Sequence, residues 1–282
     1  MTQAPGMARA AVLGSPIAHS LSPVLHRAAY AALGLSGWSY QAIECDEAEL
    51  PALLAGLGPE WAGLSLTMPL KRAVLPLLDS VSDLAVEVGG VNTVLFDGGG
   101  TGGRHGDNTD VHGIVAALRE AGVRAPGSAA VLGGGATAAS ALAALRDLGL
   151  DTATLVVRDP GRAADTLRVA DRLGLTLSVR GLDALSDIAA TDLVISTLPS
   201  GAADPLAGAL AGVPALLDVA YSPWPTAAAE AVAAKGGTVV SGFAMLLHQA
   251  VRQVELMTGR GDVPVEAMRA AGEAELARRA AG

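Results

Sequence analysis

The feature that most constrains the fold is a glycine-rich turn between an apolar run and a helix-forming segment. Residues 129–132 are apolar, residues 133–135 are three glycines, and a segment rich in alanine and leucine begins at Thr137. Glycine permits a tight turn and a close approach of backbone to ligand, so this order is typical of the dinucleotide-binding turn of doubly wound sheets. A glycine-rich turn without a ligand is the alternative interpretation.

The chain from Asp110 to residue 242 alternates between expected strands and helices. Thr109 is placed to cap a helix that runs through Leu118, and further helices are expected from Thr137 and Gly161. Short apolar strands are expected at residues 129–132, 154–157, 176–179, 193–196, 215–219 and 238–241. This alternation predicts a parallel sheet with helices on both faces, and hence a Rossmann-type doubly wound dinucleotide-binding domain over residues 110–242.

The first hundred residues mix strands and helices with less regularity. Strands are expected at residues 10–13, 38–44, 63–68 and 91–96. A helix is expected with Ser22 as its N-cap, Pro23 as its first residue and Gly34 as its stop. A last helix is expected at residues 265–279. We therefore predict an α/β protein of two domains, with an N-terminal α/β substrate domain over residues 1–109 plus 243–282.

Composition narrows the class of protein. The chain has 282 residues, of which 51% are hydrophobic, so two packed cores are expected. Its net charge is -9, and it has no Lys/Arg cluster, which argues against a nucleic-acid or anionic-membrane partner. The uncharged stretch 125–145 is divided by Pro126 and several glycines, so we interpret it as a buried βα unit rather than a membrane span.

The cysteine and histidine content bears on compartment and chemistry. Cys45 is the single cysteine, which fits a reducing cytoplasm, and we expect it to be a small core residue. Residues 1–10 lack the pattern of a signal peptide, so a cytoplasmic location is expected. The histidines lack metal-ligand spacing, so no metal is expected, and no Ser-His-Asp order or nucleophile elbow favours hydrolysis.

The end of the second strand after the glycine turn bears on the choice of nucleotide. An acidic residue about twenty residues after the turn usually binds the ribose of NAD, whereas an arginine accommodates the extra phosphate of NADP. Here Arg158 and Asp159 occur together, with Arg162 one turn later. Two guanidinium groups favour NADP, while Asp159 leaves NAD open. The alternative for both arginines is a solvated loop.

Five further segments resemble motifs of the shikimate dehydrogenase family, and they occur in the same order and with similar spacing. They are residues 14–26 (GSPIAHSLSPVLH), 65–71 (SLTMPLK), 91–93 (VNT) with 107–110 (DNTD), 218–226 (DVAYSPWPT) and 242–249 (GFAMLLHQ). The resemblance runs from about Val12 to Met257. It implies a reversible NADPH-dependent reduction of 3-dehydroshikimate to shikimate, a step of aromatic amino-acid (chorismate) biosynthesis. We expect the active cleft to lie between the two domains, and both a monomer and a homodimer stay open.

The resemblance also implies a role for each matching position. Lys71 and Asp110 are the expected catalytic residues. The expected substrate-binding residues are Ser20, Ser22, Thr67, Asn92, Tyr221 and Gln249. The expected cofactor-binding residues are Gly133, Gly134, Gly135, Ala136, Arg158, Asp159, Arg162, Ser196, Thr197, Val219, Gly242 and Met245. Each of the polar substrate residues could instead have a structural hydrogen bond, and Ser22 could simply cap its helix.

The chemistry of ketone reduction suits the catalytic pair. A hydride must reach carbon and a proton must reach oxygen, and a lysine near the carbonyl can supply the proton and stabilise negative charge. The alternative for Lys71 is an exposed surface lysine, and for Asp110 a helix cap.

The sequence departs from the family pattern at Arg27, Ala136, Ala139 and Asp159, and the last three concern the grip on the cofactor. Three other functions also stay open. They are an NAD-preferring quinate/shikimate dehydrogenase, a paralogue acting on another hydroxylated acid, and a non-catalytic sensor that binds a metabolite.

Overall fold

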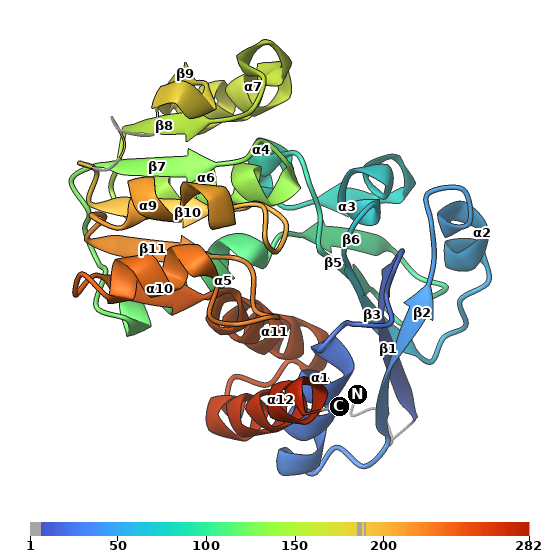
Figure 1. Cartoon of the computed structure of the whole chain (residues 1–282). Coiled ribbons are helices and arrows are strands. Elements are labelled where there is room, and N and C mark those ends of the chain that lie inside the picture. The colour runs from blue at the N-terminus through green and yellow to red at the C-terminus, as the bar shows by residue number, and fades with distance from the viewer. Residues whose placement is uncertain (1–6, 185–187, 189, 282) are drawn as a thin grey trace. The chain divides into compact units, whose positions relative to one another are not determined.

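The computed structural model describes residues 7–184, 188 and 190–281 and divides the chain into two compact units. Unit 1 comprises Met1–Thr109 and Gln249–Gly282, and unit 2 comprises Asp110–His248 (Figure 1). The second boundary between the units, between His248 and Gln249, lies inside helix α11 (Gly242–Thr258). The chain was expected to re-enter the substrate domain at residue 243, but α11 continues unbroken past that residue. The expectation that no signal peptide is present concerned residues 1–10, and residues 1–6 of that stretch lie outside the described residues.

Unit 2 is built on one parallel sheet in the order β12-β11-β10-β7-β8-β9. Its strands are β7 (Ala129–Leu132), β8 (Thr152–Val156), β9 (Thr176–Arg180), β10 (Leu193–Ser196), β11 (Ala215–Asp218) and β12 (Thr238–Ser241). Strands β8 and β9 lie to one side of β7, and β10, β11 and β12 lie to the other, so the order reverses between β7 and β10. This topology confirms the predicted doubly wound fold. In folds of this kind, ligands bind at the carboxyl ends of the strands, near the point where the strand order reverses.

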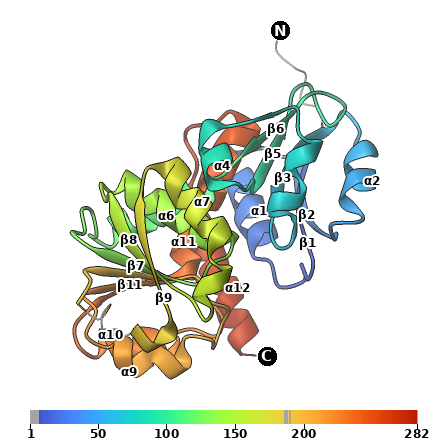
Figure 2. The same cartoon turned by 90° about the horizontal axis from the view of Figure 1, so that it is seen from above.

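Helices cover both faces of this sheet, as Figure 2 shows for α6 and α9. Among the described residues, the α-helices of unit 2 are α5 (Asp110–Glu120), α6 (Ala136–Asp147), α7 (Ala164–Leu173), α9 (Ala207–Leu210), α10 (Ala227–Ala233) and the start of α11. Short 3-10 helices occur at Pro160–Arg162, Leu182–Ala184 and Asp204–Leu206. The expected helix start at Gly161 was wrong, because Asp159 closes a 3-10 turn there and α7 begins only at Ala164.

The predicted βα unit at residues 125–145 is confirmed as β7 followed by α6. Its lack of charge has a physical reason, because Ala138 to Leu145 are all buried against the sheet and the neighbouring helices. In the described part of the chain, no helix is both long enough and apolar enough to cross a membrane.

Unit 1 contains a mixed sheet in the order β2-β1-β3-β5-β6-β4. Its strands are β1 (Ala8–Gly14), β2 (Trp38–Glu44), β3 (Trp61–Leu66), β4 (Ser80–Val81), β5 (Thr93–Phe96) and β6 (Arg104–Asp107). Strand β5 is antiparallel to both β3 and β6, whereas the other pairs are parallel. The strands β4 and β6 were not predicted, because β4 has two residues and β6 is mostly polar.

The helices of unit 1 pack on this sheet and on each other. They are α1 (Ser22–Ala32), α2 (Leu50–Ala55), α3 (Leu70–Ala73), α4 (Asp83–Val88), the end of α11 and α12 (Val265–Ala280), with a 3-10 turn at Leu75–Leu77. The N-terminal α1 lies against the C-terminal α12, as Figure 1 shows. Ser22 is the first residue of α1 and not its N-cap, and the Ser20 hydroxyl accepts the Ser22 N–H at 3.2 Å instead.

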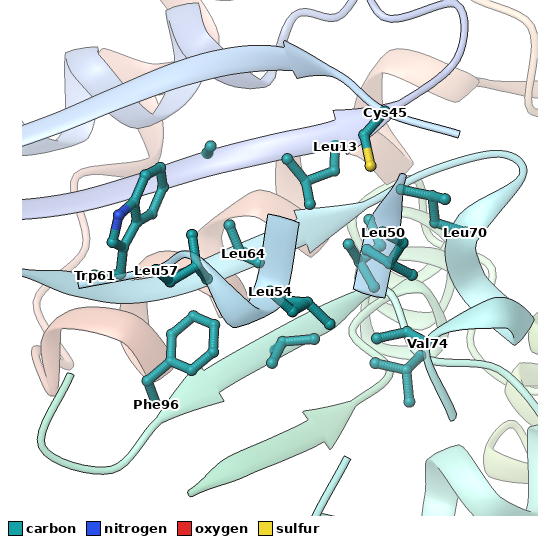
Figure 3. Close-up of a cluster of buried hydrophobic side chains, with 14 of the residues drawn as sticks. Leu13, Cys45, Leu50, Leu54, Leu57, Trp61, Leu64, Leu70, Val74 and Phe96 are labelled. Carbon is teal, nitrogen blue, oxygen red and sulfur yellow. The ribbon is translucent and has the colours of Figure 1, made fainter. Parts of the chain in front are cut away.

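The core of unit 1 on the α2 face is aliphatic with two aromatic rings at one end (Figure 3). Leu13, Leu54 and Leu64 are buried side by side, with Trp61 and Phe96 at one end of the cluster. Cys45 is fully buried in this cluster, which confirms the expectation of a core residue. Burial, together with Glu49 and Asp46, raises the pKa of the Cys45 thiol, so a reactive thiolate is disfavoured.

His26 is a neutral imidazole in the interior of unit 1. Its ring is 0% exposed and stacks on Tyr40 with 3.9 Å between centroids. Its Nδ1 lies 2.9 Å from the Ser22 carbonyl oxygen, to which it donates, while Nε2 is buried without a partner among the described residues. Burial lowers the pKa of His26 to about 4. Protonation would therefore place a charge in the core.

We expect His26 to make the protein less stable as the pH falls from about 6.5 to about 4. In the unfolded chain His26 binds a proton near its ordinary pKa of 6.5, and in the folded protein it does so only at about 4, so the unfolded state gains protons first. The loss should approach roughly 3 kcal/mol, which denaturant unfolding at several pH values would measure. The variant His26→Phe keeps a stacking ring, and we expect a flatter pH dependence. An equal loss in both proteins would contradict this prediction.

Candidate functional site

The strand directions in unit 1 bring several candidate residues to one edge of its sheet. Strands β1, β3 and β6 run in the same direction, and β5 runs in the opposite direction. Residues that follow β3 and β6 and the residue that precedes β5 therefore share an edge. These residues are Thr67, Asn108 with Thr109, and Asn92.

Asn92 joins the segments that meet at this edge. It is 2% exposed, and its Oδ1 accepts the Thr109 N–H at 2.8 Å. Its Nδ2 donates to Thr109 Oγ1 at 3.0 Å and lies 3.4 Å from Gln249 Oε1. The backbone of Asn92 is bonded to β3 at Leu66 and to β6 at Asp107. Two expected substrate-binding residues, Asn92 and Gln249, are thus brought together by the fold.

A buried network of hydrogen bonds, which was not predicted from the sequence, fixes the backbone of Asn92. Gln253, one helical turn after Gln249, donates from Nε2 to Thr93 Oγ1 at 3.0 Å and to the Asn92 carbonyl at 3.3 Å. Its Oε1 accepts from Ser65 Oγ at 2.8 Å, and Ser65 accepts from the Tyr40 hydroxyl at 2.6 Å. The spacing of four residues between two glutamines on one helix was the available signal, because such residues share a face.

The other substrate candidates of unit 1 follow the ends of β1 and β3, with Ser20 and Thr67 outside helices and Ser22 at the start of α1. Ser20 is half-buried and Ser22 is 5% exposed, with the Ser22 hydroxyl near that of Tyr40. Thr67 is half-buried and donates its N–H to the Leu13 carbonyl at 2.9 Å. Gly14 is required here, because a Cβ at this position would lie 2.3 Å from Thr67 Cγ2. The close approach of these two loops fixes Thr67 beside the end of β1.

Lys71 lies in the short helix α3 and is half-buried. Its carbonyl oxygen accepts the Val91 N–H at 2.8 Å, which ties α3 to the segment leading into Asn92. Of the remaining candidates, Asp110 and Tyr221 belong to unit 2. Asp110 is 4% exposed and is the first residue of α5, directly after Thr109, whose backbone is held by Asn92.

The turn between β7 and α6 in unit 2 has the geometry expected for a nucleotide. Gly133 has φ +100°, and a Cβ there would lie 2.7 Å from Thr197 Oγ1. Both the backbone conformation and the lack of space therefore disfavour a side chain at this position. Helix α6 starts at Ala136 after Gly135 without a side-chain cap from the described residues. A Cβ on Gly135 would meet nothing within 4 Å. Uncapped N–H groups behind an open glycine fit a pyrophosphate.

The loop after β8 holds the charged candidates for the nucleotide. Arg158, Asp159 and Arg162 are exposed, and within the described residues neither arginine has an ion-pair partner. The Asp159 carboxylate accepts the Gly161 N–H at 3.0 Å and so caps the following turn. The two guanidinium groups are thus available to an anion, while one oxygen of Asp159 has a local structural role. This arrangement fits a phosphorylated ribose better than a free one.

The remaining cofactor candidates differ in accessibility. Thr197 is half-buried and donates its N–H and its hydroxyl to the Leu132 carbonyl, at 2.9 and 2.8 Å. Ser196 is 0% exposed, so its side chain lies in the interior. Val219 is half-buried, whereas Gly242 and Met245 are buried. Gly134 accepts the Thr166 hydroxyl at 3.2 Å through its carbonyl.

Two family models match parts of the chain. Residues 12–94 match the model described as "Shikimate dehydrogenase substrate binding domain", and residues 242–271 match "Shikimate 5'-dehydrogenase C-terminal domain". The first match lies within unit 1, and the second spans α11 and the start of α12.

Full-length relatives agree with these matches. Shikimate dehydrogenase (NADP(+)) of Thermus thermophilus is 37% identical, covering 98% of this chain and 100% of the relative. A structure of the enzyme from that organism in complex with NADP(H) and shikimate has a TM-score of 0.83 at 34% identity, over 95% and 99% of the two chains. The Mycobacterium tuberculosis shikimate dehydrogenase structure has a TM-score of 0.87 at 46% identity, over 95% and 99%. A quinate dehydrogenase of Corynebacterium glutamicum in complex with NAD has a TM-score of 0.84 at 30% identity, over 95% and 99%.

Proposed function

This chain belongs to the shikimate dehydrogenase family, and we propose that it catalyses the reversible, NADP-dependent interconversion of 3-dehydroshikimate and shikimate. The observation that carries the proposal is that one chain has both a polar cluster suited to the substrate and a glycine turn suited to the nucleotide. Unit 1 has a buried polar cluster around Asn92 at the edge of its sheet, and unit 2 has an uncapped, glycine-lined turn for a nucleotide. The reaction belongs to aromatic amino-acid biosynthesis.

Unit 1 binds the substrate in this proposal. The ring hydroxyls and the carboxylate need several hydrogen-bonding groups held in fixed positions. The proposed groups are Ser20, Ser22, Thr67, Asn92 and Gln249 from unit 1, with Tyr221 from unit 2. Asn92 and Gln249 are supported by their hydrogen-bonded cluster, which leaves their side chains little freedom to rotate.

Unit 2 binds the nucleotide. The pyrophosphate is proposed to lie on the N-terminus of α6, at Gly133, Gly134, Gly135 and Ala136. Arg158 and Arg162 are proposed to bind the ribose phosphate of NADP, since both guanidinium groups lack an ion-pair partner among the described residues. Thr197, Val219, Gly242 and Met245 complete the proposed set, with Ser196 and Asp159 contributing through backbone or turn geometry.

Lys71 and Asp110 perform the proton chemistry in this proposal. When bound, NADP(H) supplies or accepts the hydride. In the reduction direction, the Lys71 ammonium donates a proton to the carbonyl oxygen, which becomes the hydroxyl of shikimate. In the oxidation direction, the neutral amine takes that proton back. The family resemblance assigns Asp110 as the carboxylate that supports Lys71 in this role.

Nicotinamide absorbance with two substrates and two cofactors tests the proposal. Purified protein is mixed with shikimate or quinate, each with NADP or NAD. We expect turnover of shikimate chiefly with NADP. Comparable or better turnover of quinate with NAD would reassign the protein to the catabolic activity to which Asp159 points. Absence of turnover in every pairing would overturn the enzymatic assignment and favour a binding role.

A further inference from the structure

A buried carboxyl group that has no assigned role lies at the end of β11. Asp218 is 1% exposed, and its Oδ1 accepts the Ala220 N–H at 3.2 Å. Its Oδ2 accepts the Thr226 hydroxyl at 2.8 Å. Burial raises the pKa of Asp218, and these hydrogen bonds oppose the shift by favouring the charged form. One carboxyl group thus ties together the two ends of the loop formed by residues 219–226.

Thr226 passes this connection on to a helix. It is the N-cap of α10, and its Oγ1 accepts the Ala229 N–H at 3.2 Å while donating to Asp218. The hydroxyl therefore uses both its donor and an acceptor site. A methyl group in its place would leave the buried carboxyl oxygen without this donor, which is costly in the interior.

The start of the same loop is also fixed from the side of α11. The Val219 N–H donates to the Ser196 carbonyl at 3.0 Å, and the Gly242 N–H donates to the Ala220 carbonyl at 3.1 Å. Gly242 packs so closely that a Cβ would lie 1.9 Å from the Val219 carbonyl oxygen. The backbone at Val219 and Ala220 is therefore held on two sides, and Asp218 provides the bond that orients the Ala220 amide.

We propose that Asp218, acting with Thr226, is a positioning residue that sets the location of Val219 and Tyr221 in the active enzyme. The inference rests on the proposed function, in which Val219 contacts the cofactor and Tyr221 contacts the substrate. Asp218 itself is buried, so we propose that it acts through the loop and not by direct contact with either ligand. Its position one residue before Val219 and three before Tyr221 lets a small rotation of the loop displace both side chains.

The variants Thr226→Val and Thr226→Ser separate positioning from general structural damage. Thr226→Val keeps the shape and removes the hydroxyl, and Thr226→Ser retains the hydroxyl as a matched control. We expect Thr226→Val to lower kcat/KM for shikimate about 10- to 100-fold, and Thr226→Ser to stay near wild type. Asp218→Leu should show the larger loss, because both bonds disappear.

Adenosine 2',5'-bisphosphate is the second probe. It carries the ribose phosphate proposed to bind Arg158 and Arg162, and it lacks the nicotinamide end. We expect its Kd to be unchanged within about twofold in Thr226→Val, because the β8 end of the sheet is not altered. Equal losses of this affinity and of kcat/KM would overturn positioning in favour of global damage. A fully active Thr226→Val would overturn it directly, whereas an inactive wild type would overturn the proposed function and this inference with it.

Discussion

Replacement of Lys71 by methionine is expected to lower kcat for shikimate oxidation by about 10²- to 10⁴-fold, the range in which general acid–base groups contribute. Methionine fills a similar volume and cannot transfer a proton. The carbonyl oxygen of Lys71 holds the Val91 amide, and this backbone bond does not depend on the side chain. We therefore expect the fold and the affinity for NADP to change little, which steady-state kinetics and nucleotide titration would measure.

The sequence offers a matched control for this experiment, because Lys71 and Lys235 are its only two lysines. Lys235 is exposed after α10, so Lys235→Met should retain activity. Lys71→Arg keeps the positive charge, but a guanidinium group stays protonated near neutral pH. We expect Lys71→Arg to remain strongly impaired. Recovery of activity in Lys71→Arg would contradict proton transfer and assign Lys71 a purely electrostatic role.

The fold of unit 2 was the more predictable, for a physical reason. Strands of a parallel sheet are buried on both faces, and they therefore stand out as apolar runs between glycine, proline and polar turns. Strands β7, β10 and β12 have the predicted bounds, and the other strands of this sheet differ by one or two residues. Here local composition and tertiary environment agree.

Unit 1 was less predictable because its elements are short or polar. Helices α3 and α4 have four and six residues, too few to show a helical period. Strand β6 has the sequence RHGD, a composition that does not indicate a strand. Its strand conformation is evident only from its antiparallel pairing with β5 in the folded sheet. The antiparallel β5 is what brings Asn92 to Thr109, so the cluster around Asn92 could not be built from the sequence alone.

The loop after β8 shows how a motif and its geometry can differ. From sequence, Arg158 and Arg162 favoured NADP, and Asp159 left NAD open. In the structure, the Asp159 carboxylate accepts the Gly161 amide, a common use of Asp before Pro-Gly in turns. The turn chemistry of residues 159–161 thus accounts for the aspartate without a ribose. The arginines have no such local explanation among the described residues.

Replacement of both Arg158 and Arg162 by alanine is therefore expected to lower kcat/KM for NADP about 100-fold or more and to leave kcat/KM for NAD nearly unchanged. Each guanidinium is proposed to make charge-assisted hydrogen bonds to the ribose phosphate, which NAD lacks. The measurement is kcat/KM with each cofactor at saturating shikimate. The exposed Arg168, which pairs with Asp165 on α7, supplies the control variant Arg168→Ala.

The variant Asp159→Thr completes this test, because threonine can still cap the turn but carries no charge. If the role of Asp159 is local, activity with NAD should not fall, and repulsion of the phosphate should decrease, so activity with NADP should stay equal or rise. A selective loss of activity with NAD would instead assign Asp159 to the ribose hydroxyls. Equal losses with both cofactors in the double arginine variant would place the guanidinium groups outside the phosphate site and remove the physical basis for a preference for NADP.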